Sequence, residues 1–235
     1  MKLIEKNGCP PDYTHWCRSV AGTEQEDYEE IPKKCKNTLK AVLLEEQGFI
    51  CGYTMKRIDQ DNAHIEHIKP QHVCKVEKRG LKLGLDLDYG NMIACYPEKN
   101  NKGEPLYGAH KKGKWWENNG IDFISPLDNS CQRSFRFDLD GKITALNPKA
   151  FKTIEVLALD NSSLTQIRGR VIYEHIYGSA GVKSICQANR KMERILEKDG
   201  RGKYHEFCIA IHDALQEHIK TLEKASKRKK YVKKK

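Results

Sequence analysis

Five consecutive residues of this chain carry the side chains that phosphodiester hydrolysis needs. They are His64-Ile-Glu-His-Ile68, and Pro70 follows shortly after them. A carboxylate such as Glu66 can bind a divalent metal ion, and a neutral imidazole such as His67 can take a proton from water because its ordinary pKa lies near 6.5. An acid followed directly by a histidine therefore predicts a metal ligand beside a general base, as in a one-metal nuclease.

The same five residues carry a geometric difficulty. Neighbouring residues of a regular strand point to opposite faces, so Glu66 and His67 would diverge in an ideal strand. Because Pro70 indicates that the strand is ending, we expect a bend that brings both side chains to one pocket. His64 shares the face of Glu66 and is expected to orient it or to contribute directly. The alternative is that both histidines are ordinary hydrogen-bonded side chains of a packed strand.

Two polar residues further along the chain extend the pattern. Asn91 opens an Asn-Met-Ile segment, and His110 precedes Lys111-Lys-Gly113. Taken singly, they would be a turn residue and an exposed loop histidine. In this order they resemble the HNH, or ββα-metal, nucleases, which have an acid-histidine pair, then an asparagine, then a histidine or asparagine at a helix start near Lys-Gly. The resemblance implies that Asn91 holds the loop that aims His67, and that Glu66 and His110 bind the metal.

The resemblance is narrower than the nuclease class. The chain resembles the PtuB-type HNH proteins of Septu anti-phage systems, which also accompany some retrons. The likeness covers most of residues 1–147. Besides the residues above, it rests on Gln47-Gly48, Phe49-Ile-Cys-Gly-Tyr53, Asn91 to Cys95, Ser125-Pro-Leu-Asp128 and Phe135-Arg-Phe-Asp-Leu-Asp-Gly141.

This resemblance implies a function. It implies an endonuclease that uses Mg²⁺, Mn²⁺ or another divalent ion and cleaves nucleic acid beside a PtuA-type ATPase in anti-phage defence. DNA is the expected substrate, and the sequence leaves RNA open. The competing interpretation is a non-catalytic nucleic-acid-binding or adaptor module on the same scaffold. The intact pair of Glu66 and His67 favours the enzyme, because a protein that only binds has no need for it.

The cysteines depart from the family pattern. Many relatives carry two cysteine pairs that chelate a structural zinc ion, whereas here Cys51 and Cys95 stand at the first positions and Thr54 and Gly108 at the second. A tetrahedral zinc site needs four ligands, so we expect no structural zinc. The alternative is that Cys74 or a nearby histidine substitutes. The nine cysteines are odd in number and widely spaced, which argues against a disulfide framework.

The charge of the chain favours an anionic partner. Among its 235 residues, 42 are basic and 32 acidic, which gives a net charge of +10. Lys227 to Lys235 contain seven of the basic residues and no acidic ones. This tail is either a non-specific phosphate contact or a solvated helix end, and the sequence supports both equally.

A basic-aromatic segment follows the second histidine. Lys111, Lys112 and Lys114 are expected to face nucleic acid and hold its phosphate backbone. Trp115 and Trp116 come next, and an indole could stack on an unpaired base. We expect at least one of these two rings to be buried instead.

Composition indicates a globular protein rather than a disordered or membrane protein. Hydrophobic residues make up 38% and charged residues 31% of the chain. The longest apolar runs are far shorter than the roughly 20 residues that span a bilayer. The N-terminus has no hydrophobic stretch typical of a secretion signal, so we expect a cytoplasmic location.

Periodicity predicts an α+β fold that must position these residues. We expect an N-terminal arm and helix at 1–48, an HNH ββα-metal nuclease core at 49–147, and a C-terminal helical bundle with a basic tail at 148–235. Residues 1–32 and 71–90 look irregular. Expected helices span 33–47, 108–116, 148–159, 163–177, 182–198 and 204–225, and expected strands span 49–53, 63–68 and a hairpin at 135–146.

Overall fold

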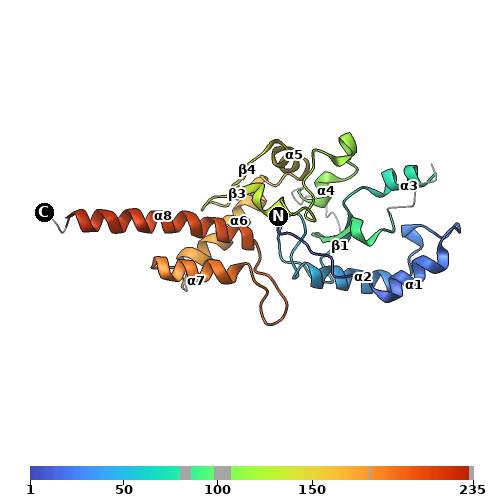
Figure 1. Cartoon of the computed structure of the whole chain (residues 1–235), viewed down its shortest axis with the longest axis horizontal. Coiled ribbons are helices and arrows are strands. Elements are labelled where there is room, and N and C mark those ends of the chain that lie inside the picture. Colours follow the sequence, from blue (N-terminus) through green and yellow to red (C-terminus); the bar gives the residue numbers. More distant parts are fainter. Residues whose placement is uncertain (80–85, 98–106, 180, 233–235) are drawn as a thin grey trace.

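The computed structural model of the chain describes residues 1–79, 86–97, 107–179 and 181–232 (Figure 1). It is a mixed α+β structure in which two small antiparallel sheets lie among helices. The helices are α1 Pro11–Val20, α2 Lys33–Glu46, α3 Gln71–Arg79, α4 Ala109–Lys112, α5 Pro148–Leu157, α6 Ser162–Tyr177, α7 Ile185–Ile195 and α8 Cys208–Val232. The strands are β1 His64–His67, β2 Met92–Cys95, β3 Phe135–Phe137 and β4 Ile143–Ala145.

The first sheet carries the candidate catalytic residues. It pairs β1 with β2, so that His64 lies opposite Cys95 and His67 opposite Met92. The strand predicted at residues 63–68 is therefore confirmed. Every residue of β2 is buried, and this strand fixes β1 against the hydrophobic core.

The strand predicted at residues 49–53 is wrong. This segment makes turns and contains an isolated bridge between Ile50 and Arg57 rather than a ladder. The side chain of Gln47 takes part of a strand's place: its Nε2 donates to the Ala94 carbonyl (2.8 Å) and its Oε1 accepts from the Ala94 amide (2.6 Å). Because buried backbone groups must be paired, these two bonds and one from the Gly52 amide to the Ala94 carbonyl (3.1 Å) satisfy Ala94 without a continuous third strand.

Two segments that were expected to be irregular contain helices. Within residues 1–32, α1 begins at Pro11, a position where the missing N–H of proline has no hydrogen bond to lose. Within residues 71–90, α3 begins directly after Pro70, whose carbonyl accepts a hydrogen bond from the Cys74 amide. Both prolines therefore mark helix starts, which the weak periodicity of these segments did not reveal.

The second half of the chain follows the predicted order. The hairpin predicted at 135–146 is confirmed as β3 and β4, with a turn at Asp140-Gly141. The helices expected after residue 148 are confirmed as α5 to α8, with ends that differ by a few residues. The short helix expected within 108–116 forms only as α4. None of the helices that the structure describes combines the length and the hydropathy that a bilayer-spanning segment needs.

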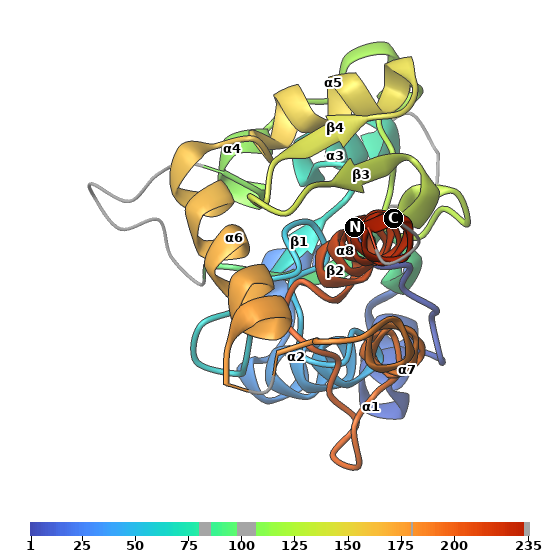
Figure 2. The same ribbon diagram turned by 90° about the vertical axis from the view of Figure 1, so that its left-hand side faces the viewer.

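The last helix organises the C-terminal part. The first half of α8 packs against α6, α7 and β3, as Figure 2 shows by looking along its axis. Its apolar stripe is buried at Ile211 and Leu215 and half-buried at Ile219. Further along, α8 projects beyond the other elements (Figure 1). In the basic tail, residues 233–235 lie outside the described residues. For residues 228–232 the structure describes the helix but not the side chains.

One hydrophobic core runs through all three predicted parts of the chain. It includes Leu43 of α2, Cys95 of β2, Leu157 of α5 and Leu215 of α8. The N-terminal arm belongs to it as well, because Met1 is only 1% exposed. The sheet that holds the candidate site therefore depends on packing from both ends of the chain.

A buried arginine joins the β3–β4 turn to α6. The Arg168 side chain donates from Nε to the Gly141 carbonyl (2.5 Å) and from Nη2 to the Leu159 carbonyl (3.2 Å). Burial lowers the pKa of Arg168 to about 10, although the charges of Asp138 and Asp160 oppose the shift. Its bonds to two carbonyls offset the cost of burying the guanidinium group.

Replacing Arg168 should destabilise the fold. Arg168→Ala leaves two buried carbonyls unpaired and a cavity beside Phe137, so we expect the free energy of unfolding to fall by roughly 3–5 kcal/mol in denaturant titrations. Arg170→Ala is the matched control, because Arg170 is exposed on the same helix. Its effect should stay within about 0.5 kcal/mol, and equal losses in the two variants would contradict the role of Arg168.

Candidate active site

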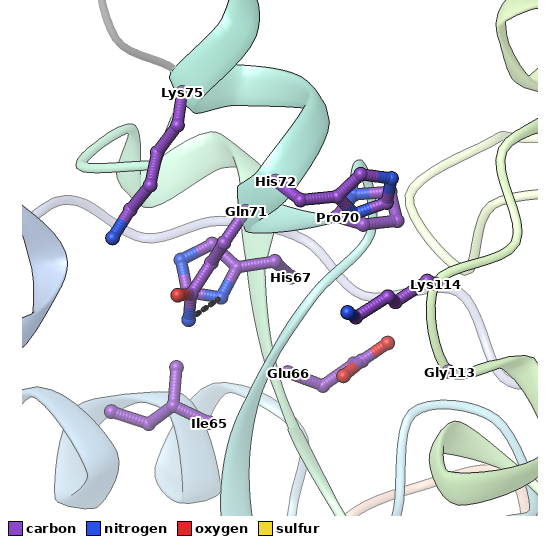
Figure 3. Close-up of a pocket in the computed structure, with 9 residues that line it drawn as sticks. All are labelled: Ile65, Glu66, His67, Pro70, Gln71, His72, Lys75, Gly113 and Lys114. Carbon is purple, nitrogen blue, oxygen red and sulfur yellow. Dashed lines mark hydrogen bonds between the residues drawn. The ribbon is translucent and has the colours of Figure 1, made fainter.

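Glu66 and His67 line one open cavity of about 350 Å³ (Figure 3). Their side chains leave β1 in different directions, His67 toward Gln71 and Glu66 toward Gly113 and Lys114. The predicted bend that would point both side chains the same way is absent from β1. Both nevertheless line the cavity. The remaining lining residues are Ile65, Pro70, His72 and Lys75.

The imidazole of His67 is held in one tautomer. Its Nε2 lies 2.9 Å from the Asp86 carbonyl oxygen. Since a carbonyl can only accept, Nε2 carries the proton, and Nδ1 is left as the basic nitrogen. The amide Nε2 of Gln71 lies 3.3 Å from Nδ1 and donates to it. The ring also packs edge-on against Tyr28, with 4.5 Å between ring centroids.

Burial keeps this imidazole neutral. The His67 side chain is almost fully buried, and desolvation lowers its pKa below the ordinary value of about 6.5. The hydrogen bond to Asp86 and the charge of Glu66 oppose the shift but do not cancel it. At neutral pH, His67 is therefore in the protonation state that a general base requires.

A buried ammonium group holds the other half of the pair. Lys112 Nζ lies 2.8 Å from Glu66 Oε1 and 3.0 Å from the His67 carbonyl oxygen, and the lysine side chain has no exposed surface. The expectation that Lys112 faces nucleic acid is therefore wrong. It lies on α4, a helix of four residues that packs against the core. Lys111 and Lys114 on either side of it are exposed, and Lys114 lines the cavity.

His64 and Glu66 form the second ion pair of the site. His64 Nε2 lies 3.9 Å from Glu66 Oε2, and His64 Nδ1 lies 2.5 Å from the Pro97 carbonyl oxygen. Burial opposes ionisation of both groups. For Glu66, hydrogen bonds and charges from His64 and Lys112 outweigh burial and lower the pKa. For His64, the hydrogen bond and charge of Glu66 and the bond to Pro97 outweigh burial and raise the pKa.

His110 lies next to His64, one member of this ion pair. The two imidazole rings are 5.2 Å apart, and His110 Nε2 lies 3.2 Å from the Pro97 carbonyl oxygen. His110 is not among the residues that line the cavity of Glu66 and His67. Within the described ranges, no group of three His, Cys, Asp or Glu side chains is arranged to hold a metal ion. The oxygen Glu66 Oε2, on the side of His64, and the imidazoles of His64 and His110 have donor chemistry that suits a divalent ion coordinated largely by water.

Asn91 fixes the chain just beyond β1. Its Oδ1 accepts from the Lys69 amide (2.8 Å), and its Nδ2 donates to the Lys69 carbonyl (3.0 Å). Its own carbonyl accepts from the Ile68 amide (2.9 Å). These bonds hold the segment that follows His67.

The four positions compared with a zinc site lie close together. The Cys51 Sγ accepts a hydrogen bond from the Tyr96 amide (3.4 Å), and a Cβ atom on Gly108 would lie 3.1 Å from the Thr54 methyl group. Burial opposes ionisation of Cys51, but hydrogen bonds from the Cys95 thiol, the Thr54 hydroxyl and backbone amides outweigh it and lower its pKa to about 6. Cys74 lies elsewhere, with its Sγ 3.9 Å from Asn91 Nδ2.

The two tryptophans after α4 pack against the core rather than standing free for stacking. Trp115 and Trp116 are half-buried, and both indole Nε1 atoms are buried without a hydrogen-bond partner in the described structure. Trp115 contacts Phe123, with 5.9 Å between ring centroids. Neither ring is fully enclosed, so the expectation of a buried indole is met only in part.

Three contacts of His67 were not predicted from the sequence. Gln71 and Tyr28 touch its ring, and Asp86 acts through its backbone carbonyl. The Asp86 carboxylate is itself buried, and both of its oxygens lack a hydrogen-bond partner in the part of the chain that the structure describes. The spacing of four residues between His67 and Gln71 was visible in the sequence, but a strand ends and a helix begins between them.

Gln71 should control the basicity of His67. In Gln71→Glu the amide donor is replaced by a carboxylate, which stabilises the imidazolium form, so we expect the pKa of His67 to rise. Gln71→Ala removes only the donor to Nδ1 and should raise the pKa less. NMR titration of the His67 ring in the three proteins checks this order. Identical titration curves would show that Gln71 does not contact the basic nitrogen.

The pair of His64 and Glu66 should make stability depend on pH. The raised pKa of His64 means that its contribution is fully present below about pH 6.5 and is lost as the pH rises through the folded-state pKa. We therefore expect His64→Gln to lower the free energy of unfolding more at about pH 6 than at about pH 9. Both values lie above the range in which Glu66 becomes protonated. His15→Gln, at an exposed position, is the control, and a pH-independent loss in His64→Gln would contradict the ion pair.

Comparison with known proteins gives one informative similarity. No protein-family model matches the chain. Over 188 residues, the chain is 29% identical to a protein of Vibrio cholerae serotype O1 biovar El Tor, and the alignment covers 76% of this chain and 81% of that protein. The Vibrio protein is named "Retron Vc95 putative HNH endonuclease". The chain is thus similar to this Vibrio protein over most of its length.

Proposed function

We propose that this chain is a metal-dependent HNH endonuclease that hydrolyses phosphodiester bonds of nucleic acid, with DNA as the expected substrate. The observation that carries the proposal is the cavity in which the Glu66 carboxylate, the neutral His67 imidazole and the exposed Lys114 meet. The similarity to the Vibrio retron protein supports the same class of enzyme. The net charge of +10 agrees with a phosphate-rich partner.

His67 is the proposed general base. Its Nδ1 would take a proton from the water that attacks the phosphorus, while the bond from Nε2 to the Asp86 carbonyl keeps the ring in place. In the structure, Gln71 occupies the hydrogen-bonding position at Nδ1, so the attacking water must displace its amide. Asn91 is the proposed positioning residue, because its bonds to Lys69 fix the chain that carries His67.

The charged half of the site would act on the phosphate. Glu66 would hold the divalent ion, Mg²⁺ or Mn²⁺, with His110 as the second ligand and His64 beside it. Such an ion supplies neutralisation of the charge that develops on the phosphate oxygens. Lys112 keeps Glu66 ionised and oriented from within the protein, and the exposed Lys111 and Lys114 would contact the phosphate backbone.

The biological setting is the second part of the proposal. We propose that the nuclease acts in anti-phage defence beside an ATPase of the PtuA type. The support is the resemblance of residues 1–147 to PtuB-type proteins and the retron origin in the name of the Vibrio protein. Such a partner would restrain or direct the nuclease, because unregulated cleavage would damage the host.

A cleavage assay tests the enzyme. The full chain, alone and with the ATPase, is mixed with plasmid and Mg²⁺ or Mn²⁺, and nicking is followed over time. We expect Glu66→Gln and His67→Ala each to reduce the rate by about 10²-fold or more, because they remove the proposed ligand and the proposed base. His15→Ala replaces an exposed histidine far along the chain from the site and should cleave at the original rate. Cleavage that survives in His67→Ala would refute the assignment of the base.

A non-catalytic nucleic-acid-binding or adaptor module is the second candidate. Two observations favour it: Lys112 already pairs with Glu66, and the described residues contain no group of three His, Cys, Asp or Glu side chains arranged to hold a metal ion. This candidate predicts tight binding of nucleic acid that needs no divalent ion. It also predicts no cleavage of DNA or RNA with either metal, whether or not the ATPase is present.

A further inference from the structure

A second cavity lies in the C-terminal helical part of the chain. It has a volume of about 390 Å³, within the range of pockets that accept small ligands. It shares no lining residue with the cavity of Glu66 and His67. In Figure 1, α7, which forms much of its wall, lies at a distance from α3 and β1. The lining residues are His175, Gln187, Arg190, Lys191, Arg194, Ile195 and His205.

The charged lining of this cavity is entirely basic. Arg190, Lys191 and Arg194 carry positive charge, and no acidic side chain is among the lining residues. Glu174 and Glu193, which lie close by in the sequence, do not line it. The cavity on α8 and the β3–β4 hairpin differs in this respect, because acids and bases both line it. The α7 cavity therefore has a positive potential that nothing in its wall cancels.

The two arginines are available for a ligand. Arg190 and Arg194 are one turn apart on α7, about 6 Å along the helix axis, and both are exposed. Within the described residues, neither guanidinium group has an ion pair or a hydrogen bond to another side chain. Arginine pairs with phosphate through two parallel N–H donors, and exposed phosphates bound in this way need no base-specific contact.

Three other lining residues, Lys191, His175 and His205, contact one another in the wall of the cavity. Lys191 Nζ donates to the His175 carbonyl (2.5 Å), which fixes this ammonium group between α6 and α7. The His175 and His205 rings meet edge-on at 5.4 Å. Burial, together with Lys191 and His205, lowers the pKa of His175 to about 4, so this ring stays neutral at pH 7. Its Nδ1 is buried and has no hydrogen-bond partner among the described residues.

We propose that Arg190 and Arg194 form a second phosphate-binding site, which holds the nucleic-acid backbone away from the cleavage site. The choice of nucleic acid as the ligand rests on the proposed nuclease function. The binding itself does not depend on cleavage, since it needs only the two guanidinium groups and the positive cavity. The site adds affinity without sequence preference, because phosphate contacts do not read the bases.

Binding measurements without divalent ions test this site. The full chain is titrated in EDTA with a fluorescent DNA duplex at several salt concentrations, so that no cleavage occurs. In the double variant R190A/R194A we expect the dissociation constant to rise on the order of tenfold or more, because two charged hydrogen-bonding groups are lost. The slope of log K against log salt should become less negative by about 1.8, which corresponds to two phosphate contacts.

The double variant K220A/K224A is the matched control. It also removes two positive charges one turn apart on an exposed helix surface, but from the cavity in which Asp138, Asp213 and Glu217 are present. We expect its dissociation constant to stay within about twofold of the original value. If both double variants bind DNA equally weakly, the loss of affinity comes from net charge and the proposal is overturned. Unchanged DNA binding in R190A/R194A would overturn it as well. Unchanged DNA binding with lost binding of the ATPase would overturn it in favour of a protein-docking surface.

These outcomes are separate from those of the cleavage assay. If the chain cleaves DNA but R190A/R194A binds normally, the second phosphate site is wrong and the nuclease stands. If the chain never cleaves but R190A/R194A binds DNA more weakly than the control, the second phosphate site is correct and the chain is a non-catalytic adaptor. Circular dichroism of both double variants verifies that the exposed substitutions leave the helices folded.

Discussion

The candidate site depends on the burial of one ammonium group. Lys112 has no exposed side-chain surface, and a buried charge is tolerated only where partners compensate for lost hydration. Both partners come from β1: the Glu66 carboxylate and the backbone carbonyl of His67. The lysine therefore fixes α4 against β1 and keeps Glu66 ionised. It also determines which carboxylate oxygen remains for an incoming ligand.

The strand separates two electrostatic environments. On one side, Lys112 and His64 favour the ionised form of Glu66, and Glu66 favours the charged form of His64. On the other side, desolvation favours the neutral form of His67. An acid kept charged beside an imidazole kept neutral suits the proposed roles of metal ligand and general base. Both side chains nevertheless line one cavity.

Local sequence patterns were sufficient for the elements with strong periodicity. The helix after residue 33, the β3–β4 hairpin and α8 follow from such patterns. The strand predicted at 49–53 did not form, because the side-chain amide of Gln47 together with the Gly52 backbone amide satisfies Ala94, which no pattern encodes. The burial of Lys112 also escaped prediction, since four residues of α4 show no periodicity. Tyr28 and Asp86 reach His67 from segments distant in the sequence, and Gln71 reaches it across the end of a strand and the start of a helix, so local patterns did not reveal these contacts.

The antiparallel pairing of β1 with β2 has a consequence for how the chain can evolve. Along a strand, side chains alternate with a period of two, so the loss or gain of one residue exchanges the two sides. A one-residue deletion before Glu66 would turn its carboxylate away from the Lys112 ammonium and leave that charge buried alone. Insertions and deletions within residues 64–67 are therefore far more damaging than most replacements, and this short stretch should keep its length wherever the Lys112 contact is retained.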